Sequence, residues 1–101
     1  MWIQFNNAFL SIVENRDNKL ELLVRARIKG DIEEIFPEAD VFEDESADYR
    51  YRAFISKAKV AERMTLKMKE INYDNFKNSV NEIERKNAYS NVWMELRKLQ
   101  K

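Results

Sequence analysis

The chain has 101 residues, of which 45% are hydrophobic and 36% charged, with one glycine and one proline. This composition is typical of an ordered, helix-rich globular chain. The sequence contains no cysteine and no histidine, which excludes disulfides, thiolate metal sites, thiol nucleophiles and the commonest acid-base group of enzymes. Eighteen basic and eighteen acidic side chains cancel, so no net charge favours nucleic acid or an anionic membrane.

The first segment contains two short apolar runs, Trp2 to Phe5 and Ala8 to Glu14, on either side of Asn6 and Asn7. Asparagine tolerates the positive φ of tight turns, so this arrangement predicts a hairpin of two strands. Apolar residues of the same segment also recur at helical spacing, which leaves a helix over residues 1–14 as the alternative.

A strand is predicted from Leu20 to Ile28, because apolar and mostly basic side chains alternate there. Gly30 ends this strand. Asp31, followed three residues later by Glu34, matches a capping box and predicts the start of a short helix. Pro37 must end that helix, since proline lacks an amide hydrogen and clashes with the preceding turn.

A second alternating strand, Tyr49 to Ile55, leads directly into a helix predicted over residues 57–71. Val41 to Asp44 is predicted as a short acidic strand antiparallel to it. A right-handed crossover between the Leu20 strand and the Val41 strand leaves a gap, and the Tyr49 strand is expected to fill it. The predicted buried side of the helix consists of Val60, Ala61, Met64, Met68 and Ile71.

Asp74 is a candidate cap for a short helical turn, and the last helix is predicted from Ile83 to Leu99. Its apolar stripe consists of Tyr89, Val92, Trp93, Leu96 and Leu99. Such a stripe predicts core, with a dimer or partner surface as the alternative. The sequence therefore predicts one α+β domain over residues 1–101, with an antiparallel sheet of four to five strands and the helices 57–71 and 83–99 packed on one face.

Three stretches of the chain are distinctive: ADYRYR at 47–52, INYDNFKNSV at 71–80 and AYSNVW at 88–93. Together they resemble a family of small uncharacterised bacterial proteins of about this length, of the kind found on phages and other mobile elements. The resemblance extends over nearly the whole chain and implies a biological setting. It implies no activity, ligand or catalytic residue.

One candidate site is a set of arginines on strands predicted to be neighbours. Its members are Arg25, Arg27, Arg50 and Arg52. With Tyr49 and Tyr51 interleaved, they predict a sheet face that binds single-stranded nucleic acid, with phosphates on guanidinium groups and bases on rings. Strict alternation, however, places both tyrosines on the face opposite Arg50 and Arg52. The alternative is that these arginines pair across the hairpin with Glu43 or Asp44.

The other candidate site is acidic, because residues 31–48 hold nine Asp and Glu and no Lys or Arg. Its predicted partner-binding residues are Glu38, Asp40, Glu43, Asp44, Glu45 and Asp48. Such a surface suits a basic groove on a protein partner, for example that of a host nucleic-acid or defence enzyme under inhibition. The alternative is a solvated face. A cation site at Asp44, Glu45 and Asp48 lacks the spacing and the glycine of an EF-hand loop.

The predicted function is therefore that of a non-enzymatic interaction protein that binds a macromolecular partner through the acidic surface. A nucleic-acid-binding module is the alternative. We expect no catalytic residue, cofactor or metal site. With no signal peptide and no long apolar run in the sequence, we also expect a cytoplasmic protein without membrane contact, and a homo-oligomer remains open.

Overall fold

The structure, a computed structural model, describes residues 1–101 and divides into two compact units, Met1–Ile71 (unit 1) and Asn72–Lys101 (unit 2). Unit 1 contains β1 (Trp2–Phe5), β2 (Ala8–Glu14), β3 (Glu21–Ala26), α1 (Asp31–Ile35), β4 (Phe42–Glu43), β5 (Tyr51–Ser56) and α2 (Lys57–Lys69). Unit 2 contains α3 (Phe76–Ser79), α4 (Ile83–Leu96) and the 3-10 turn Arg97–Leu99. The α+β class is confirmed. The single domain over residues 1–101 stays a prediction.

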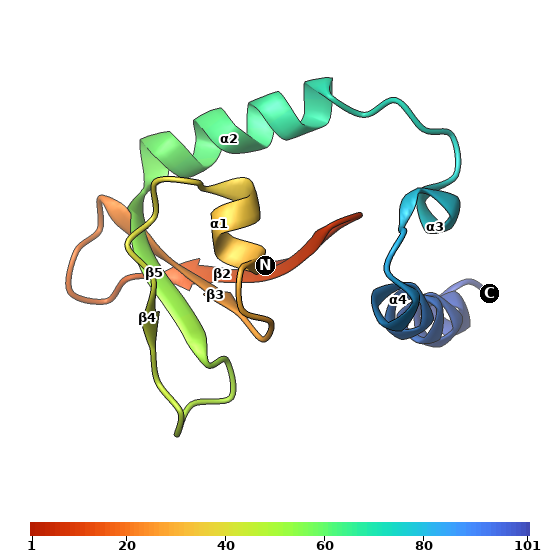
Figure 1. Ribbon diagram of the computed structural model, residues 1–101, viewed down its shortest axis with the longest axis horizontal. Helices are drawn as coiled ribbons and strands as arrows, with labels where there is room; N and C mark the ends of the chain where they lie inside the picture. Colours follow the sequence, from red (N-terminus) through yellow and green to blue (C-terminus); the bar gives the residue numbers. More distant parts are fainter. The chain divides into compact units, whose positions relative to one another are not determined.

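Unit 1 is built on a five-stranded antiparallel sheet in the order β1-β2-β3-β5-β4 (Figure 1). Strand β5 lies between β3 and β4, as the crossover argument predicts. The hairpin of β1 and β2 is also confirmed, with Phe5 opposite Ala8 across the Asn6-Asn7 turn, so the helical alternative for residues 1–14 is wrong. The apolar residues of this segment fit helical spacing as well as strand alternation, so spacing alone does not distinguish a helix from a hairpin. The pairing of β1 with β2 does.

The start of α1 differs from the predicted capping box. Gly30 occupies the N-cap position with a left-handed φ of 96°, and no side chain caps the helix. Asp31 is the first helical residue, and its carboxylate accepts a hydrogen bond from the Phe9 amide at 2.9 Å. The Asp31 side chain therefore joins α1 to β2. The helix ends at Ile35, before Pro37, as predicted.

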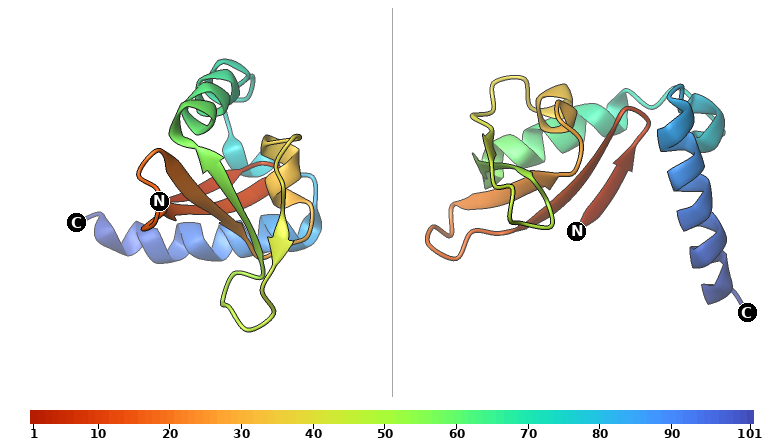
Figure 2. Two further views of the ribbon diagram at one scale, coloured as in Figure 1. Left: turned by 90° about the vertical axis from the view of Figure 1, so that its left-hand side faces the viewer. Right: turned by 60° about the horizontal axis from the view of Figure 1, so that its bottom comes forward.

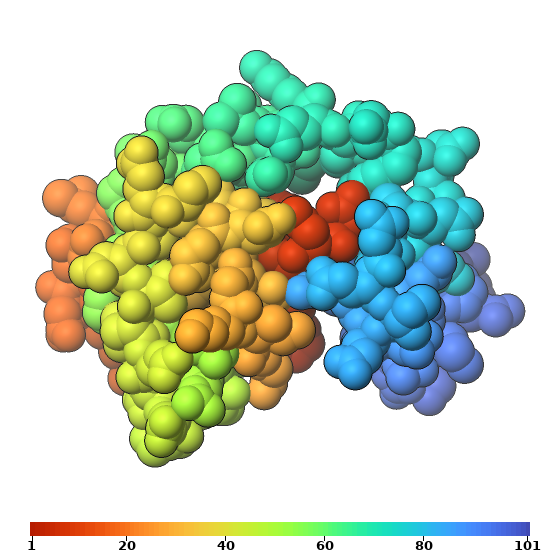
Figure 3. All heavy atoms as spheres, viewed as in Figure 1, coloured from red at the N-terminus to blue at the C-terminus, as the bar shows by residue number.

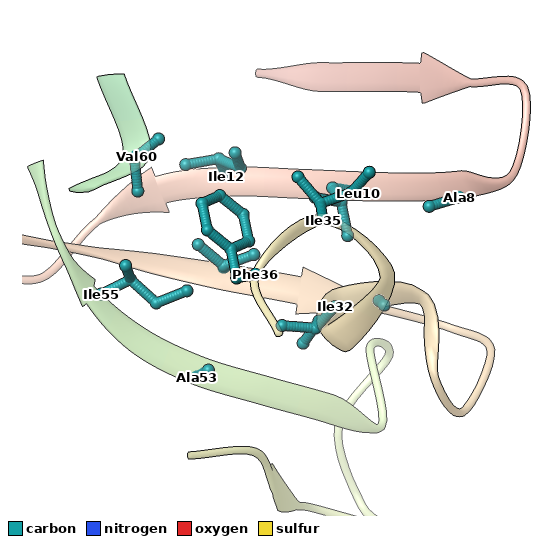
Figure 4. Close-up of a cluster of buried hydrophobic side chains, with 11 residues drawn as sticks. Ala8, Leu10, Ile12, Ile32, Ile35, Phe36, Ala53, Ile55 and Val60 are labelled. Carbon is teal, nitrogen blue, oxygen red and sulfur yellow. The ribbon is translucent and has the colours of Figure 1, made fainter. Parts of the chain in front are cut away.

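One face of the sheet carries the core of unit 1, and α1 and the first turns of α2 pack against it (Figure 2). Leu10, Val24 and Ala53 project from three adjacent strands and are fully buried. Ile32 and Ile35 of α1 close over them (Figure 4). In the space-filling view, the atoms of α1 and the loop that follows it lie over the strands on this side (Figure 3). We name this side of the sheet the covered face.

Helix α2 packs against this core only through its first half. The Ser56 hydroxyl caps it by accepting a hydrogen bond from the Lys59 amide at 3.1 Å. Val60 is buried and Met64 is partly buried against the core. The prediction of one continuous buried side is wrong for the other three residues, because Ala61 is exposed, Met68 is 72% exposed and Ile71 is 51% exposed.

Unit 2 has a small aromatic centre in which Phe76 stacks on Tyr89 at 5.7 Å between ring centroids. The N-cap of α3 is Asn75, which accepts a hydrogen bond from the Asn78 amide, and not the predicted Asp74. Of the predicted α4 stripe only Tyr89 is buried; Val92, Trp93, Leu96 and Leu99 are 39–75% exposed. The core assignment of these four residues is therefore wrong. That α4 packs on the sheet stays a prediction, since α4 belongs to unit 2.

Candidate nucleic-acid interface

The face of the sheet opposite the covered face carries arginines and aromatic rings, and we name it the open face. Strand alternation and pairing register assign its side chains, because directly opposed residues project to the same side. One row crosses all five strands and consists of Trp2, Ser11, Arg25, Arg52 and Phe42. The sheet therefore places two arginines at its centre and an aromatic ring at each end of the row.

Arg25 and Arg52 lie directly opposite each other on β3 and β5. Like charges in this position repel, and no carboxylate lies within salt-bridge distance of either one. Arg25 donates through Nη2 to the Ser11 hydroxyl at 2.7 Å, and its buried Nε has no hydrogen-bond partner. Arg52 donates through Nη1 to the Tyr49 carbonyl at 3.2 Å. Neutral oxygen acceptors therefore hold both guanidinium groups, and no ion pair compensates their positive charge.

Tyr49 connects the arginines of β3 with the loop before β5. Tyr49 is 4% exposed, and the guanidinium carbons of Arg25 and Arg27 lie 4.7 and 4.3 Å from the centroid of its ring. Arg27 also donates to the Asp48 carbonyl at 3.0 Å. Alternation wrongly separates Tyr49 from the arginines, because β5 begins only at Tyr51 and residue 49 lies in a bend. Tyr51 packs against the core, as predicted.

Arg50 is the one arginine of the candidate set that pairs with carboxylates. Its Nη2 lies 2.9 Å from Glu45 and 3.5 Å from Glu43. This agrees with the predicted pairing across the hairpin for Glu43, whereas Asp44 is not a partner. Both ion pairs are at the surface, where each contributes about 0 to 1 kcal/mol. The structure thus brings Arg25, Arg27 and Arg52 together without neutralisation and sets Arg50 apart from them.

Aromatic side chains that the sequence interpretation missed border the arginines. Phe42 and Phe54 contact each other at 5.7 Å between centroids and are 42% and 48% exposed. On the other side, Trp2 contacts Phe9 at 6.5 Å and is 74% exposed. One sequence signal was available for Phe54, which shares the alternation of Arg50 and Arg52. The position of Trp2 and Phe42 depends on the pairing register, which a single sequence does not specify.

The acidic candidate residues all lie at the surface, in the loop after α1 and around β4. They are Glu38, Asp40, Glu43, Asp44, Glu45 and Asp48. Glu43 and Glu45 share the single guanidinium group of Arg50, which balances one of their two negative charges. Glu38, Asp40 and Asp48 have no ion pair. The structure therefore divides the predicted acidic surface into a paired part and an unpaired part.

Asp44 has its own local partner. The Ser46 hydroxyl donates to Asp44 Oδ1 at 2.7 Å and the Ser46 amide donates to the same oxygen at 3.1 Å. These two hydrogen bonds lower the pKa of Asp44 from its ordinary 3.8, and the more distant Arg52 adds a smaller effect in the same direction. Asp44 therefore fixes the turn between β4 and β5.

No group of three or more acidic side chains is arranged to hold a metal ion, so the structure does not gather Asp44, Glu45 and Asp48 into a cation site. No helix has the length and apolar character needed to cross a bilayer.

Comparisons with protein-family models, with curated proteins and with solved structures found no match to this chain. Function is therefore inferred from the geometry of the open face and of the acidic surface.

Proposed function

We propose that this protein is a non-enzymatic binding protein whose open face holds single-stranded nucleic acid. The observation that supports this most strongly is the opposed pair Arg25 and Arg52, which has no carboxylate within salt-bridge distance and is bordered by exposed rings. A like-charged pair at the centre of a sheet costs folding free energy, and bound phosphate would relieve that cost.

The arrangement suits a single strand. Phosphates would lie on the guanidinium groups of Arg25 and Arg52, and unstacked bases on the rings of Trp2, Phe42 or Phe54. Stacking on a ring is available only to bases that are splayed out of a duplex. Stacking also accepts every base, so the predicted binding has weak sequence preference and strong salt dependence.

The test is a fluorescence anisotropy titration with a labelled oligothymidine at several salt concentrations. The double variant Arg25→Gln, Arg52→Gln should weaken binding by about tenfold or more, and the slope of log affinity against log salt should become shallower by about 0.7 for each lost phosphate contact. The matched control is Lys57→Gln, Lys69→Gln, which removes the same charge from two exposed positions of α2.

The control should bind as the wild type does. Equal losses in both double variants would show that only overall charge matters, and would contradict a specific role of the open face. No binding by the wild type at low salt would reject the proposal outright.

A second candidate function is docking of the acidic surface onto a basic groove of a protein partner, including a nucleic-acid enzyme that this chain would inhibit. The exposed carboxylates of Glu38, Asp40 and Asp48, none of which has an ion pair, favour it. Carboxylates in such a groove would occupy the places of phosphates and increase the association rate and specificity more than the affinity. A mobile-element setting, implied by the sequence resemblance, is compatible with such an inhibitor.

Affinity capture from bacterial lysate, with and without nuclease treatment and read by mass spectrometry, separates the two functions. A protein that survives nuclease and is lost with Glu38→Lys, Asp40→Lys, Asp48→Lys would support docking. Partners lost on nuclease treatment and with the Arg25 and Arg52 variant would support the open face. The three substitutions to lysine leave the Arg50 ion pairs with Glu43 and Glu45 intact, so β4 and β5 should stay paired.

A further inference from the structure

The two edges of the sheet in unit 1 differ in how they are protected. The β4 edge has only two residues, Phe42 and Glu43, and acidic side chains flank it. The β1 edge has four residues, Trp2–Phe5, and the stretch Met1–Asn7 contains no charged side chain, proline or glycine. Sheet edges are normally blocked by shortness, charge, proline or a bulge, because an open edge pairs with another strand. The β1 edge has none of these protections.

The hydrogen bonds of β1 identify which of its backbone groups face outward. Met1 and Ile12 exchange two hydrogen bonds, of 2.7 and 2.8 Å. In an antiparallel ladder the bonded positions alternate, so Ile3 and Phe5 also bond to β2. Trp2 and Gln4 therefore direct their N–H and C=O groups away from β2, and these groups form a ready template for another strand.

We propose that β1 pairs antiparallel with β1 of a second copy of this chain, about a twofold axis at Ile3. In this register Trp2 of each copy exchanges two backbone hydrogen bonds with Gln4 of the other copy. Ile3 then faces Ile3, and Met1 faces Phe5. Every opposed pair consists of uncharged side chains, so the strand is complementary to itself.

The chemistry of the strand favours a second copy over a different protein. A C2 interface requires that the same patch match its own reverse, and the five residues Met1–Phe5, centred on Ile3 and with uncharged side chains, meet that requirement. Pairing would also cover part of Trp2, which is 74% exposed, and of Met1, which is 78% exposed. The product is one continuous ten-stranded sheet with the two open faces side by side. This inference does not depend on what the open face binds.

The first test is the mass of the full chain in solution, measured by light scattering from about 10 μM to about 1 mM. A dimer has twice the 12.2 kDa of one chain. Gln4→Pro should restore the monomer, because it removes an outward N–H and leaves the bonds to β2 in place. Gln4→Lys, which places charge on the edge, should do the same. The matched control, Glu43→Pro on the β4 edge, should stay dimeric.

The second test uses the absence of cysteine from the chain. Ile3→Cys places two thiols directly opposite each other at the proposed axis, where antiparallel non-hydrogen-bonded pairs have Cα atoms about 4.5 Å apart, within reach of a disulfide. Mild oxidation should link this variant into a dimer, whereas Lys29→Cys, in an exposed loop, should stay unlinked. A monomeric mass at every concentration, a dimer that Gln4→Pro and Gln4→Lys leave intact, or equal linking of both cysteine variants would overturn the proposal.

Discussion

The two faces of the sheet in unit 1 are made by alternate residues of the same strands, yet they have opposite character. The covered face buries Leu10, Val24 and Ala53 completely, and its charged strand residues, Glu14 and Glu43, are exposed at the ends of β2 and β4. The open face places Arg25 opposite Arg52 and leaves rings such as Phe54 about half exposed. The covered face therefore holds the fold together, while the open face retains repulsion and apolar exposure that folding alone does not require.

The largest effect that tests this contrast is expected on the covered face. Leu10→Ala removes a fully buried side chain that α1 and the neighbouring strands surround. The variant should lose about 2 to 5 kcal/mol of unfolding free energy, through lost burial and the cavity that remains. Urea denaturation followed by circular dichroism measures this loss. A loss below about 1 kcal/mol would mean that the covered face is not the core.

Phe54→Ala is the corresponding change on the open face. The ring is 48% exposed and contacts Phe42, so the cost in unfolding free energy should be about 1 kcal/mol or less. Affinity for oligothymidine should fall by about 1 to 3 kcal/mol, because one stacking platform is lost. The two measurements together sharpen the contrast. A large loss of unfolding free energy with unchanged affinity for oligothymidine would show that Phe54 stabilises the fold, as the residues of the covered face do, and does not contribute to binding.

Helix α4 shows a weaker form of the same contrast, between buried Tyr89 and half-exposed Trp93. Trp93 contacts Lys77 and Arg97 through cation–π interactions, at 4.4 and 5.7 Å. Trp93→Ala should therefore cost about 1 kcal/mol or less, the range of an exposed cation–π pair. Denaturant unfolding monitored by circular dichroism tests this. A cost of about 3 kcal/mol or more would restore Trp93 to a core.

The smallest predicted effect is on Asp44, at the border of the acidic surface. Ser46→Ala removes the hydroxyl donor and should raise the pKa of Asp44 back toward 3.8. Because the pKa is lowered in the folded chain, this contribution to stability is present above about pH 4 and is lost as pH falls through the folded pKa. Carbon-detected NMR titration of the Asp44 carboxyl measures the change. An unchanged pKa would show that the Ser46 hydroxyl does not stabilise the Asp44 carboxylate.

Much of unit 1 is predictable from sequence, because alternation along a strand directly reports which side is buried. Tyr51, Ala53 and Ile55 face the core as their spacing predicts. The order of strands also follows, from the crossover between β3 and β4. The N-cap of α1 does not follow. Asp31 has the sequence of a cap, but its carboxylate bonds to Phe9, a contact between residues 22 positions apart.

The sites are harder to predict because they depend on register and on loop backbone. The opposition of Arg25 and Arg52 requires the β3–β5 register, and the place of Tyr49 requires a bend that alternation does not reveal. Periodicity fails for α4 in a different way. The stripe that includes Trp93 has helical spacing, but unit 2 has only the short α3 as another helix to cover it.

NMR mapping of the full, isotope-labelled chain during titration with oligothymidine would show directly where single-stranded nucleic acid binds. We expect shifts of the Trp2 indole and of the Arg25 and Arg52 Nε–H signals, together with shifts of the β3 and β5 amides, while the amides of α1 stay unchanged. Shifts confined to α2 or to other lysine-bearing surfaces, or no shifts at low salt, would contradict the claim that the open face binds single-stranded nucleic acid.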